Sequence, residues 1–288
     1  MTSIVIAAHN ERAVIGRCLD ALLAGAASGE FDVTVVANGC TDETPAIAAA
    51  RPGVRVIELA EAGKPAALNA GDEAARGFPR IYLDADVVLS TQGVRAIAAA
   101  LDGPHLAATV RRDLDLTGRP MLVRAYFGIH RQLPVFRDGL FGRGVIGLSE
   151  AGRRRFGRFP ALVADDLFLD SMFGASEKRQ VETVSSRVAT PRRTRDLVRR
   201  LSRVRGGNSA MRAAADQGQV DATVRPAARL SWLRDVVLPR PWLAPAALCY
   251  VAITVLAALS ARRDRDGAAG WARDDSSRQE ETHARVQR

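Results

Sequence analysis

Two pairs of carboxylates are the most chemically suggestive side chains in this sequence. Asp84 and Asp86 stand two residues apart, directly after the apolar run 81–83, and Asp165 and Asp166 open a segment with a helical apolar pattern. Two carboxylates at the end of a strand can hold a divalent cation, which can in turn hold a diphosphate. A further carboxylate beside such a cation can act as a general base. The alternatives are a solvated acidic turn for the first pair and an ordinary helix cap for the second.

The segments before Asp84 alternate between apolar strands and helices. We expect strands at 3–8, 31–37, 54–59 and 81–83, and helices capped by Asn10, starting at Thr44-Pro45, and spanning 65–76. Continuous apolar strands are typical of a parallel sheet that is covered on both faces. The sequence therefore predicts an α/β fold with a mostly parallel central sheet, in which ligands lie outside the carboxyl ends of the strands. The middle of the chain is less regular, with strands expected at 105–110 and 145–148 and a helix at 119–131.

The charge of the chain raises the question of an anionic partner. The 288 residues carry a formal charge of +9, with a pI of about 10.5, and Lys64 is one of only two lysines. No zinc-ligand spacing, RNP-like aromatic pattern or recognition helix supports nucleic-acid binding, whereas phosphate ligands and anionic lipid explain the charge equally well. The three cysteines are far apart and form neither a disulfide framework nor a metal site, so we expect a reducing cytoplasm. The N-terminus lacks the pattern of a signal peptide.

The end of the chain differs in composition from the rest. Residues 242–261 carry no charge and have roughly the length needed to cross a bilayer, with Arg240 before them and Arg262 and Arg263 after them. We expect 229–238 to be an interfacial amphipathic helix and 266–288 to be a disordered polar tail. The uncharged segment either associates with a membrane or packs on the domain as a core helix.

Four segments resemble the motifs of glycosyltransferase family 2, a group with the GT-A fold. They are Ile4 to Glu11 (IVIAAHNE), Val35 to Thr44 (VVANGCTDET), Gly63 to Gly71 (GKPAALNAG) and Asp84-Ala85-Asp86. Asp165-Asp166 lies where the family usually has Glu-Asp, and the stretch ending at Asn208 faintly resembles a later Arg-containing motif. The resemblance covers about residues 3–208 and is strongest in the first 90. Ala37 replaces an acidic residue that often contacts the base, which leaves the nucleotide open.

The resemblance implies a role for each motif residue. Asp84 and Asp86 would bind Mg²⁺ or Mn²⁺, with Asp84 also near the ribose, and Asp165 or Asp166 would be the general base. The nucleotide sugar would contact the strand ends, the loop before the third helix and the late basic segment, through Ala8, His9, Glu11, Asn38, Asp42, Lys64, Asn69, Asp84 and Arg203. Several of these have plain structural alternatives: a turn for Asn38, a helix cap for Asp42 and a solvated surface lysine for Lys64.

These observations predict an inverting, metal-assisted glycosyltransferase with a GT-A domain at 1–228, a membrane-associating segment at 229–265 and a tail at 266–288. The donor would be a UDP- or GDP-sugar, and the acceptor a hydroxyl or a lipid-linked phosphate. The expected location is the cytoplasmic face of the cell membrane. The alternatives are a nucleotidyltransferase acting on a sugar phosphate, whose usual Gly-rich phosphate loop is absent, and a catalytically inactive GT-A membrane scaffold.

Overall fold

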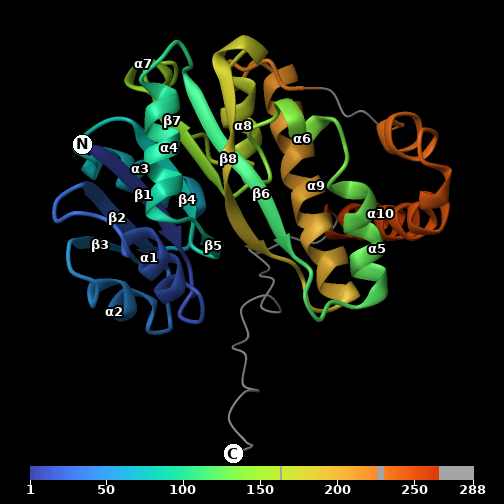
Figure 1. The fold of residues 1–288 in the computed structure, drawn as a ribbon, viewed down its shortest axis with the longest axis horizontal. Coiled ribbons are helices and arrows are strands. Elements are labelled where there is room, and N and C mark those ends of the chain that lie inside the picture. Colours follow the sequence, from blue (N-terminus) through green and yellow to red (C-terminus); the bar gives the residue numbers. More distant parts are fainter. Residues whose placement is uncertain (163, 226–229, 266–288) are drawn as a thin grey trace, which may run out of the picture.

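An eight-stranded sheet runs through the molecule, with helices packed on its faces (Figure 1). This computed structural model describes residues 1–162, 164–225 and 230–265, so the predicted tail at 266–288 lies outside the described residues. The strand order is β3-β2-β1-β4-β7-β6-β8-β5. The strands are β1 (Thr2–Ala8), β2 (Phe31–Asn38), β3 (Val54–Leu59), β4 (Arg80–Asp84), β5 (Val87–Val88), β6 (Ala107–Asp115), β7 (Val145–Leu148) and β8 (Lys178–Ala189).

The N-terminal half of the sheet is parallel, as predicted. Strand β1 pairs in parallel with β2 and β4, and β2 pairs in parallel with β3. In this register Ala8 lies opposite Ala37 and Ala7 lies opposite Asp84, so the carboxyl ends of β1, β2 and β4 meet at one edge. Helices α1 (Ile15–Leu23), α2 (Thr44–Ala49) and α3 (Lys64–Ala74) connect these strands. The core here is aliphatic, with Ile4, Ile6 and Val35 fully buried.

The other half of the sheet is mixed. Strand β7 is antiparallel to both β4 and β6, whereas β6 and β8 are parallel, with a register shift between Val110 and Arg111. Helix α4 (Thr91–Leu101) covers this half and is capped by Ser90, whose hydroxyl accepts a hydrogen bond from the Gly93 N–H. Neither β8 nor α4 is among the elements predicted above.

Several helices of the second half lie together on the right of Figure 1. Helix α10 packs against α5 and α9, and α9 also contacts α8. The helices are α5 (Met121–His130), α6 (Val135–Asp138), α7 (Glu150–Arg153), α8 (Asp165–Ser171), α9 (Thr194–Asp216) and α10 (Ala244–Arg265), with helical turns η1 (Ala175–Glu177), η2 (Trp232–Val237) and η3 (Pro241–Leu243). The described residues contain one helix that is long and apolar enough to cross a membrane, at Pro241–Arg263.

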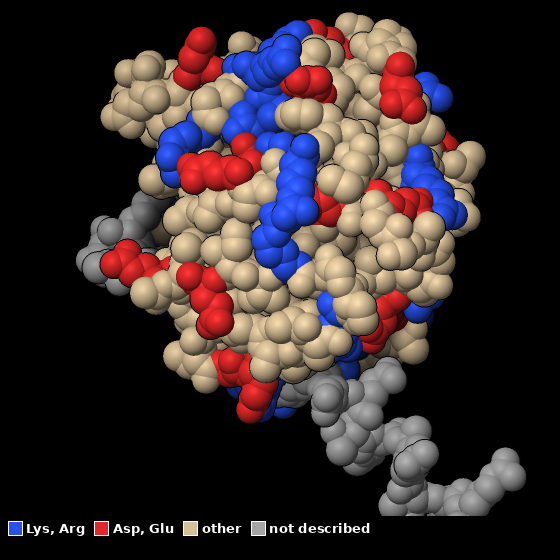
Figure 2. Space-filling view, turned by 90° about the vertical axis from the view of Figure 1, so that its left-hand side faces the viewer, with Lys and Arg blue, Asp and Glu red and all other residues tan. Residues whose placement is uncertain are grey.

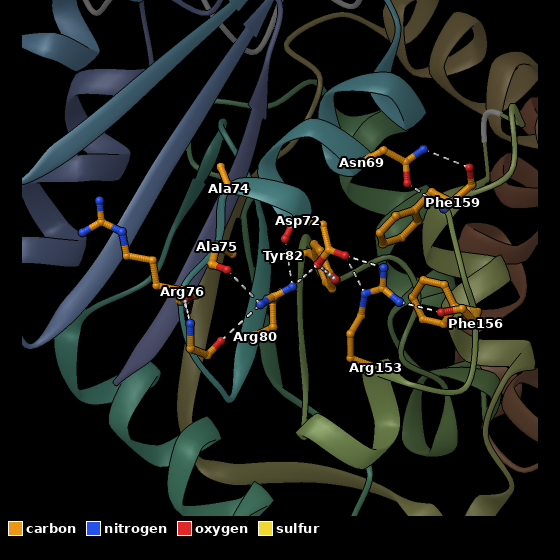
Figure 3. Close-up of polar contacts among 12 residues, drawn as sticks. Asn69, Asp72, Ala74, Ala75, Arg76, Arg80, Tyr82, Arg153, Phe156 and Phe159 are labelled. Carbon is orange, nitrogen blue, oxygen red and sulfur yellow. Dashed lines mark hydrogen bonds and ion pairs between the residues drawn. The ribbon is translucent and has the colours of Figure 1, made fainter.

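A buried ionic network joins α3 to β4 and α7 (Figure 3). The Asp72 carboxylate accepts hydrogen bonds from Arg80 (2.7 Å), the Tyr82 hydroxyl (2.7 Å) and Arg153 Nε (2.7 Å). Burial alone would raise the pKa of Asp72, but these donors outweigh it and lower the pKa. Because Arg80 begins β4 and Asp84 ends it, this network fixes the strand at the end opposite the carboxylate pair.

The sheet edge at β3 is protected by charge. Figure 2 shows basic and acidic side chains interspersed over this side of the molecule. In this part of the fold, ion pairs join Arg55 of β3 to Asp32 of β2 (3.0 Å) and Arg51 to Asp20 (3.1 Å). Charged side chains along an edge strand disfavour pairing with another chain.

Candidate active site

The carboxyl ends of β1 and β2 are tied together by Asn38. Its amide is fully buried; it donates to the Ala8 carbonyl (2.8 Å) and accepts from the Gly63 N–H (2.9 Å). The side chain therefore joins β1, β2 and the loop that precedes α3. This is more than the plain turn considered from the sequence, because a buried amide with its donors and acceptors satisfied fixes the positions of three backbone segments.

The loop after β1 is held against the loop after β2. His9 Nδ1 lies 2.6 Å from the Asn38 carbonyl, and the Glu11 N–H donates to Thr44 Oγ1 (2.7 Å). Asn10 was expected to cap the following helix, and this is wrong. Asn10 adopts φ 52°, its side chain bonds to Thr41, and α1 begins only at Ile15, without a side-chain cap. Asn tolerates this left-handed conformation, which turns the loop back over β2.

Asp42 lies in the same loop cluster and has local partners. Its carboxylate accepts hydrogen bonds from the N–H and the hydroxyl of Thr44, the first residue of α2, and from the Arg12 N–H (3.3 Å). Asp42 therefore organises the start of α2, which is the helix-cap role considered above as the alternative to nucleotide binding. Its predicted contact with a nucleotide stays a prediction.

Asp84 and Asp86 lie where β4 turns into β5. The Asp84 N–H donates to the Gly144 carbonyl (2.8 Å), so the loop before β7 packs against the pair. Gly144 adopts φ +69°, and a Cβ there would lie 2.3 Å from Val87 Cγ2 and 3.2 Å from Asp84 Oδ2. Only glycine fits both this backbone conformation and this close approach.

Lys64 bridges the two predicted carboxylate pairs. It is the first residue of α3, and its Nζ lies 2.7 Å from Asp84 Oδ1 and 2.9 Å from Asp165 Oδ2. Burial alone would lower the pKa of Lys64, but Asp165 and Asp84 outweigh burial and raise it. Lys64 is therefore a permanent cation that holds two segments about a hundred residues apart in one site, which excludes the alternative of a solvated surface lysine.

Asp165 and Asp166 form the first turn of α8. Asp166 Oδ2 accepts from the Gly142 N–H (2.9 Å), and Asp166 Oδ1 accepts from the Leu167 N–H (2.8 Å). Burial, followed by the neighbouring charge of Asp165, raises the pKa of Asp166 to about 6. A carboxyl with this pKa is ionised at neutral pH yet more basic than an exposed aspartate, which suits a general base.

Arg143 fixes the glycine-rich loop that meets both acids. This arginine is almost fully buried, and its guanidinium donates to the carbonyls of Gly139, Val110 and Phe136. It stands between Gly142, which binds Asp166, and Gly144, which binds Asp84. No pattern in the sequence indicates this role, because the partners of Arg143 are backbone carbonyls of segments that meet only in the fold.

Two further predicted residues lie in different settings. Asn69 is buried in α3 and makes two hydrogen bonds to the backbone of Phe159, at 2.8 and 3.1 Å (Figure 3). Arg203 lies half-buried in the middle of α9. Asn69 thus has a clear structural role, and nucleotide contact by either residue stays a prediction.

The carboxylates fit a divalent cation that completes its coordination from a ligand. The described residues contain no group of three or more His, Cys, Asp or Glu placed to hold a metal by themselves. A pair such as Asp84 and Asp86 is sufficient for Mg²⁺ or Mn²⁺ where phosphate oxygens and water supply the other ligands. Because residue 144 is a glycine, it places no side chain against the Asp84 carboxylate, whose Oδ2 a Cβ at that position would approach to 3.2 Å.

Known proteins identify the family. The profile of glycosyl transferase family 2 matches residues 3–155, which contain every strand-end motif described above. The chain belongs to this family. It is a glycosyltransferase, and its fold is the GT-A fold that the sequence predicted.

Solved structures agree with this fold at low sequence identity. A mannosyltransferase from Pyrobaculum calidifontis has a TM-score of 0.57 at 20% identity, over 93% of this chain and 80% of its own. Residues 1–349 of S. aureus TarS give a TM-score of 0.51 at 14% identity, over 89% of this chain and 80% of that one. No curated protein sequence matches the chain significantly.

Proposed function

We propose that this glycosyltransferase inverts the anomeric centre and transfers a sugar from a nucleotide diphosphate to a hydroxyl or a lipid phosphate, with metal assistance. The observation that carries the proposal is the Lys64 bridge. It places the carboxylates that suit a diphosphate-bound cation beside the acids that suit a general base. Direct inverting transfer to a hydroxyl is favoured by a base for the acceptor and by positive charge at the leaving diphosphate, and it requires no protein nucleophile.

The leaving group is handled at the end of β4. Asp84 and Asp86 would hold Mg²⁺ or Mn²⁺, which supplies positive charge against the charge that develops on the departing diphosphate. Lys64 is the cationic side chain that faces the same place, and it can contact a phosphate oxygen when it exchanges one of its two carboxylate partners. His9, Glu11, Asn38 and Asp42 surround the ends of β1 and β2, where the nucleoside would lie.

The acceptor is activated at α8. Asp165 is held by Lys64, whereas Asp166 is bound by two backbone N–H groups and has the raised pKa, so we assign the proton transfer to Asp166. Asp166 would remove the hydroxyl proton as the oxygen attacks the anomeric carbon from the face opposite the diphosphate. Asp165 then serves to position Lys64.

The choice of acceptor has a direct test in Asp166→Asn. A hydroxyl acceptor must lose a proton during transfer, whereas a phosphate monoester is already largely ionised at pH 7 and needs no base. The variant should lower the rate with a hydroxyl acceptor by roughly two to four orders of magnitude and leave the rate with a phosphate acceptor nearly unchanged. Equal losses with both acceptors contradict the assignment of Asp166 as the base.

For the donor, we propose a GDP- or UDP-sugar. The Pyrobaculum mannosyltransferase was solved with GDP-Man and Mn²⁺, and TarS with UDP and with UDP-GlcNAc. We further propose that 1–228 is the catalytic part and that 229–265 attaches it to the cytoplasmic face of the cell membrane, near a lipid-linked acceptor. The length and apolar character of Pro241–Arg263 support this attachment.

The proposed function is tested by a thermal-shift screen of UDP-, GDP- and dTDP-sugars with and without Mn²⁺, followed by an assay of nucleotide release. A ligand that binds only the folded state raises the unfolding temperature with its concentration. We expect one nucleotide class to stabilise the protein in the presence of metal and to be released as a diphosphate when acceptor is added. Release of pyrophosphate from a nucleoside triphosphate and a sugar phosphate would instead identify a nucleotidyltransferase. Donor binding without turnover with any acceptor would identify a scaffold.

A further inference from the structure

Helix α10 has two apolar faces with different surroundings. Ala247, Ile253 and Ala257 are at most 5% exposed, whereas Leu248 is 75% and Leu256 is 53% exposed. The inner face packs into two clusters with α5, α9 and η2, where the ring of Tyr250 stacks on Tyr126 at 5.1 Å between centroids. The helix is therefore firmly part of the folded domain on one side and uncovered on the other.

The uncovered residues form one continuous stripe. At 3.6 residues per turn, the exposed positions of α10 up to residue 259 fall within an arc of about 120°. These positions carry no polar side chain, and α10 has no charged residue between Ala244 and Ala261. We call this stripe the outer face; it consists of Ala244, Pro245, Leu248, Ala252, Val255, Leu256 and Leu259.

Further exposed apolar side chains precede the outer face along the chain. Leu230, Leu238 and Trp242 are 66–72% exposed, and all three lie in the segment that leads into α10. Tryptophan is enriched where protein meets the headgroup layer of a membrane. The uncovered apolar surface is thus larger than one helix face, and surfaces of this kind mark contact sites.

The ends of this surface are basic. Arg262 and Arg263 are exposed at the end of α10, Arg240 precedes η3, and Arg234 is exposed in η2. Among the described residues from 230 to 263, the one acidic side chain is Asp235, which pairs with Arg234 at 2.8 Å. An apolar stripe with arginines at its ends matches the acyl chains and anionic headgroups of a membrane surface.

We infer that α10 lies in the plane of an anionic membrane, with the outer face among the lipids and the inner face on the protein, and does not cross the bilayer. A helix that crosses alone must contact lipid on all sides. To do so, α10 would have to leave α5 and α9 and expose the cluster around Val123, Tyr126 and Phe127. This inference rests on the membrane association proposed above and specifies its geometry.

Vesicle flotation of the full chain tests the partner. The vesicles are phosphatidylcholine alone or with phosphatidylglycerol, and the matched variants are Ala252→Glu on the outer face and Ala99→Glu at an exposed position of α4. We expect binding to the anionic vesicles, a loss of about tenfold or more in bound fraction for Ala252→Glu, and no change for Ala99→Glu. Equal binding by both variants overturns the inference. Self-association that Ala252→Glu abolishes, with no vesicle binding by the unaltered chain, assigns the outer face to a second copy and also overturns it.

The depth of α10 in the bilayer distinguishes an in-plane helix from a helix that crosses the membrane. A fluorophore attached to the thiol of Ala252→Cys, in a variant with Cys40 and Cys249 replaced, is quenched by lipids brominated at different depths. A position near the middle of an in-plane helix should be quenched best by shallow labels, about 5–10 Å below the headgroups, whereas a crossing helix places it at the bilayer centre. Deepest quenching at the centre overturns the inference.

The proposed function is tested by separate measurements of donor binding and sugar transfer. Ala252→Glu lies outside the catalytic residues, so it should keep the donor-dependent thermal shift and transfer to a water-soluble acceptor. If flotation and depth come out as expected but no nucleotide sugar binds, the proposed function fails and the membrane geometry stands. If donor binding and transfer are normal but the protein does not float with vesicles, the membrane geometry fails and the proposed function stands.

Discussion

Asp166 carries a charge that the folded protein accommodates poorly, and this leads to a sharp prediction. Burial, followed by the neighbouring Asp165, raises its pKa from 3.8 to about 6. Replacing Asp166 by Asn removes the charge and keeps one oxygen, which can accept from one of the two N–H groups, of Gly142 or Leu167, that now bond to separate oxygens of the carboxylate. We predict that Asp166→Asn is more stable than the unaltered protein at neutral pH, and far less active on a hydroxyl acceptor.

The size and pH range of this gain follow from linkage. A pKa rise from 3.8 to about 6 corresponds to about 3 kcal/mol, and screening at a partly exposed carboxyl leaves about 1–2 kcal/mol. Between pH 4 and 6 the folded state keeps a proton that the unfolded state has lost, so the stability of the unaltered protein falls as pH rises through this window. The gain from Asn is therefore full above about pH 6 and absent below about pH 4.

Chemical denaturation at pH 7.5 and pH 4.5 measures this difference directly. Asp20→Asn is the control, because Asp20 is exposed and a hydrogen bond from Arg51 lowers its pKa, so that its removal should give no gain. A variant at position 166 that is no more stable at pH 7.5, or that gains equally at both pH values, refutes the reasoning. Unaltered turnover on a hydroxyl acceptor refutes the assignment of the base.

Three further variants test the rest of the site and its support. Asp86→Asn should abolish metal-dependent turnover without loss of stability, whereas the surface variant Asp102→Asn should keep its turnover. Full activity of Asp86→Asn, together with activity of the unaltered chain that resists EDTA, contradicts metal assistance. Lys64→Met should weaken donor binding by roughly ten- to a hundredfold in a calorimetric titration. The control Lys178→Met loses the buried ion pair with Asp170, so it should lower stability and leave donor affinity unchanged. Normal donor affinity in Lys64→Met, with weakened affinity in Lys178→Met, contradicts the role of Lys64. Asp72→Asn leaves Arg80 and Arg153 without their counter-charge and should cost about 3–5 kcal/mol in denaturant unfolding with donor affinity unchanged, so near-normal stability contradicts the importance of the network.

The parallel half of the sheet was predictable because each strand carries its own signal. Continuous apolar runs ended by turn residues placed β1, β2 and β3 to within a residue at each end. Strand β8 was missed because its residues Lys178–Ala189 mix charged and apolar side chains, and only two of the twelve are buried. Its identity as a strand comes from pairing with β6 and β5, far away in the sequence, which no local pattern reports.

For the site, the sequence identified residue types but not their partners. Asn38 and Asn69 were predicted as nucleotide contacts, yet both make buried hydrogen bonds to backbone groups of other segments. An asparagine in a motif can serve a ligand or the backbone, because the same amide groups satisfy both. The Lys64–Asp165 pair could likewise not be predicted from sequence spacing, because the two residues meet only in the folded chain, where the starts of α3 and α8 come together.

Helix α9 connects α10, the proposed membrane helix, to α8, which carries the proposed general base. Near its start, Leu197 packs in the cluster that holds Ile253 of α10, and near its end, Met211 packs in the cluster that holds Leu167 and Phe168 of α8. These two positions are fourteen residues apart, which is about 21 Å along a helix. If α10 lies in the membrane plane, Asp165 and Asp166 are fixed relative to that plane through one rigid element. A lipid-linked acceptor then meets the site at a set height, and the attachment raises its effective concentration without adding contacts. Cutting the chain before α10 would therefore do more than release a tether, because it would also uncover the cluster that seats the start of α9.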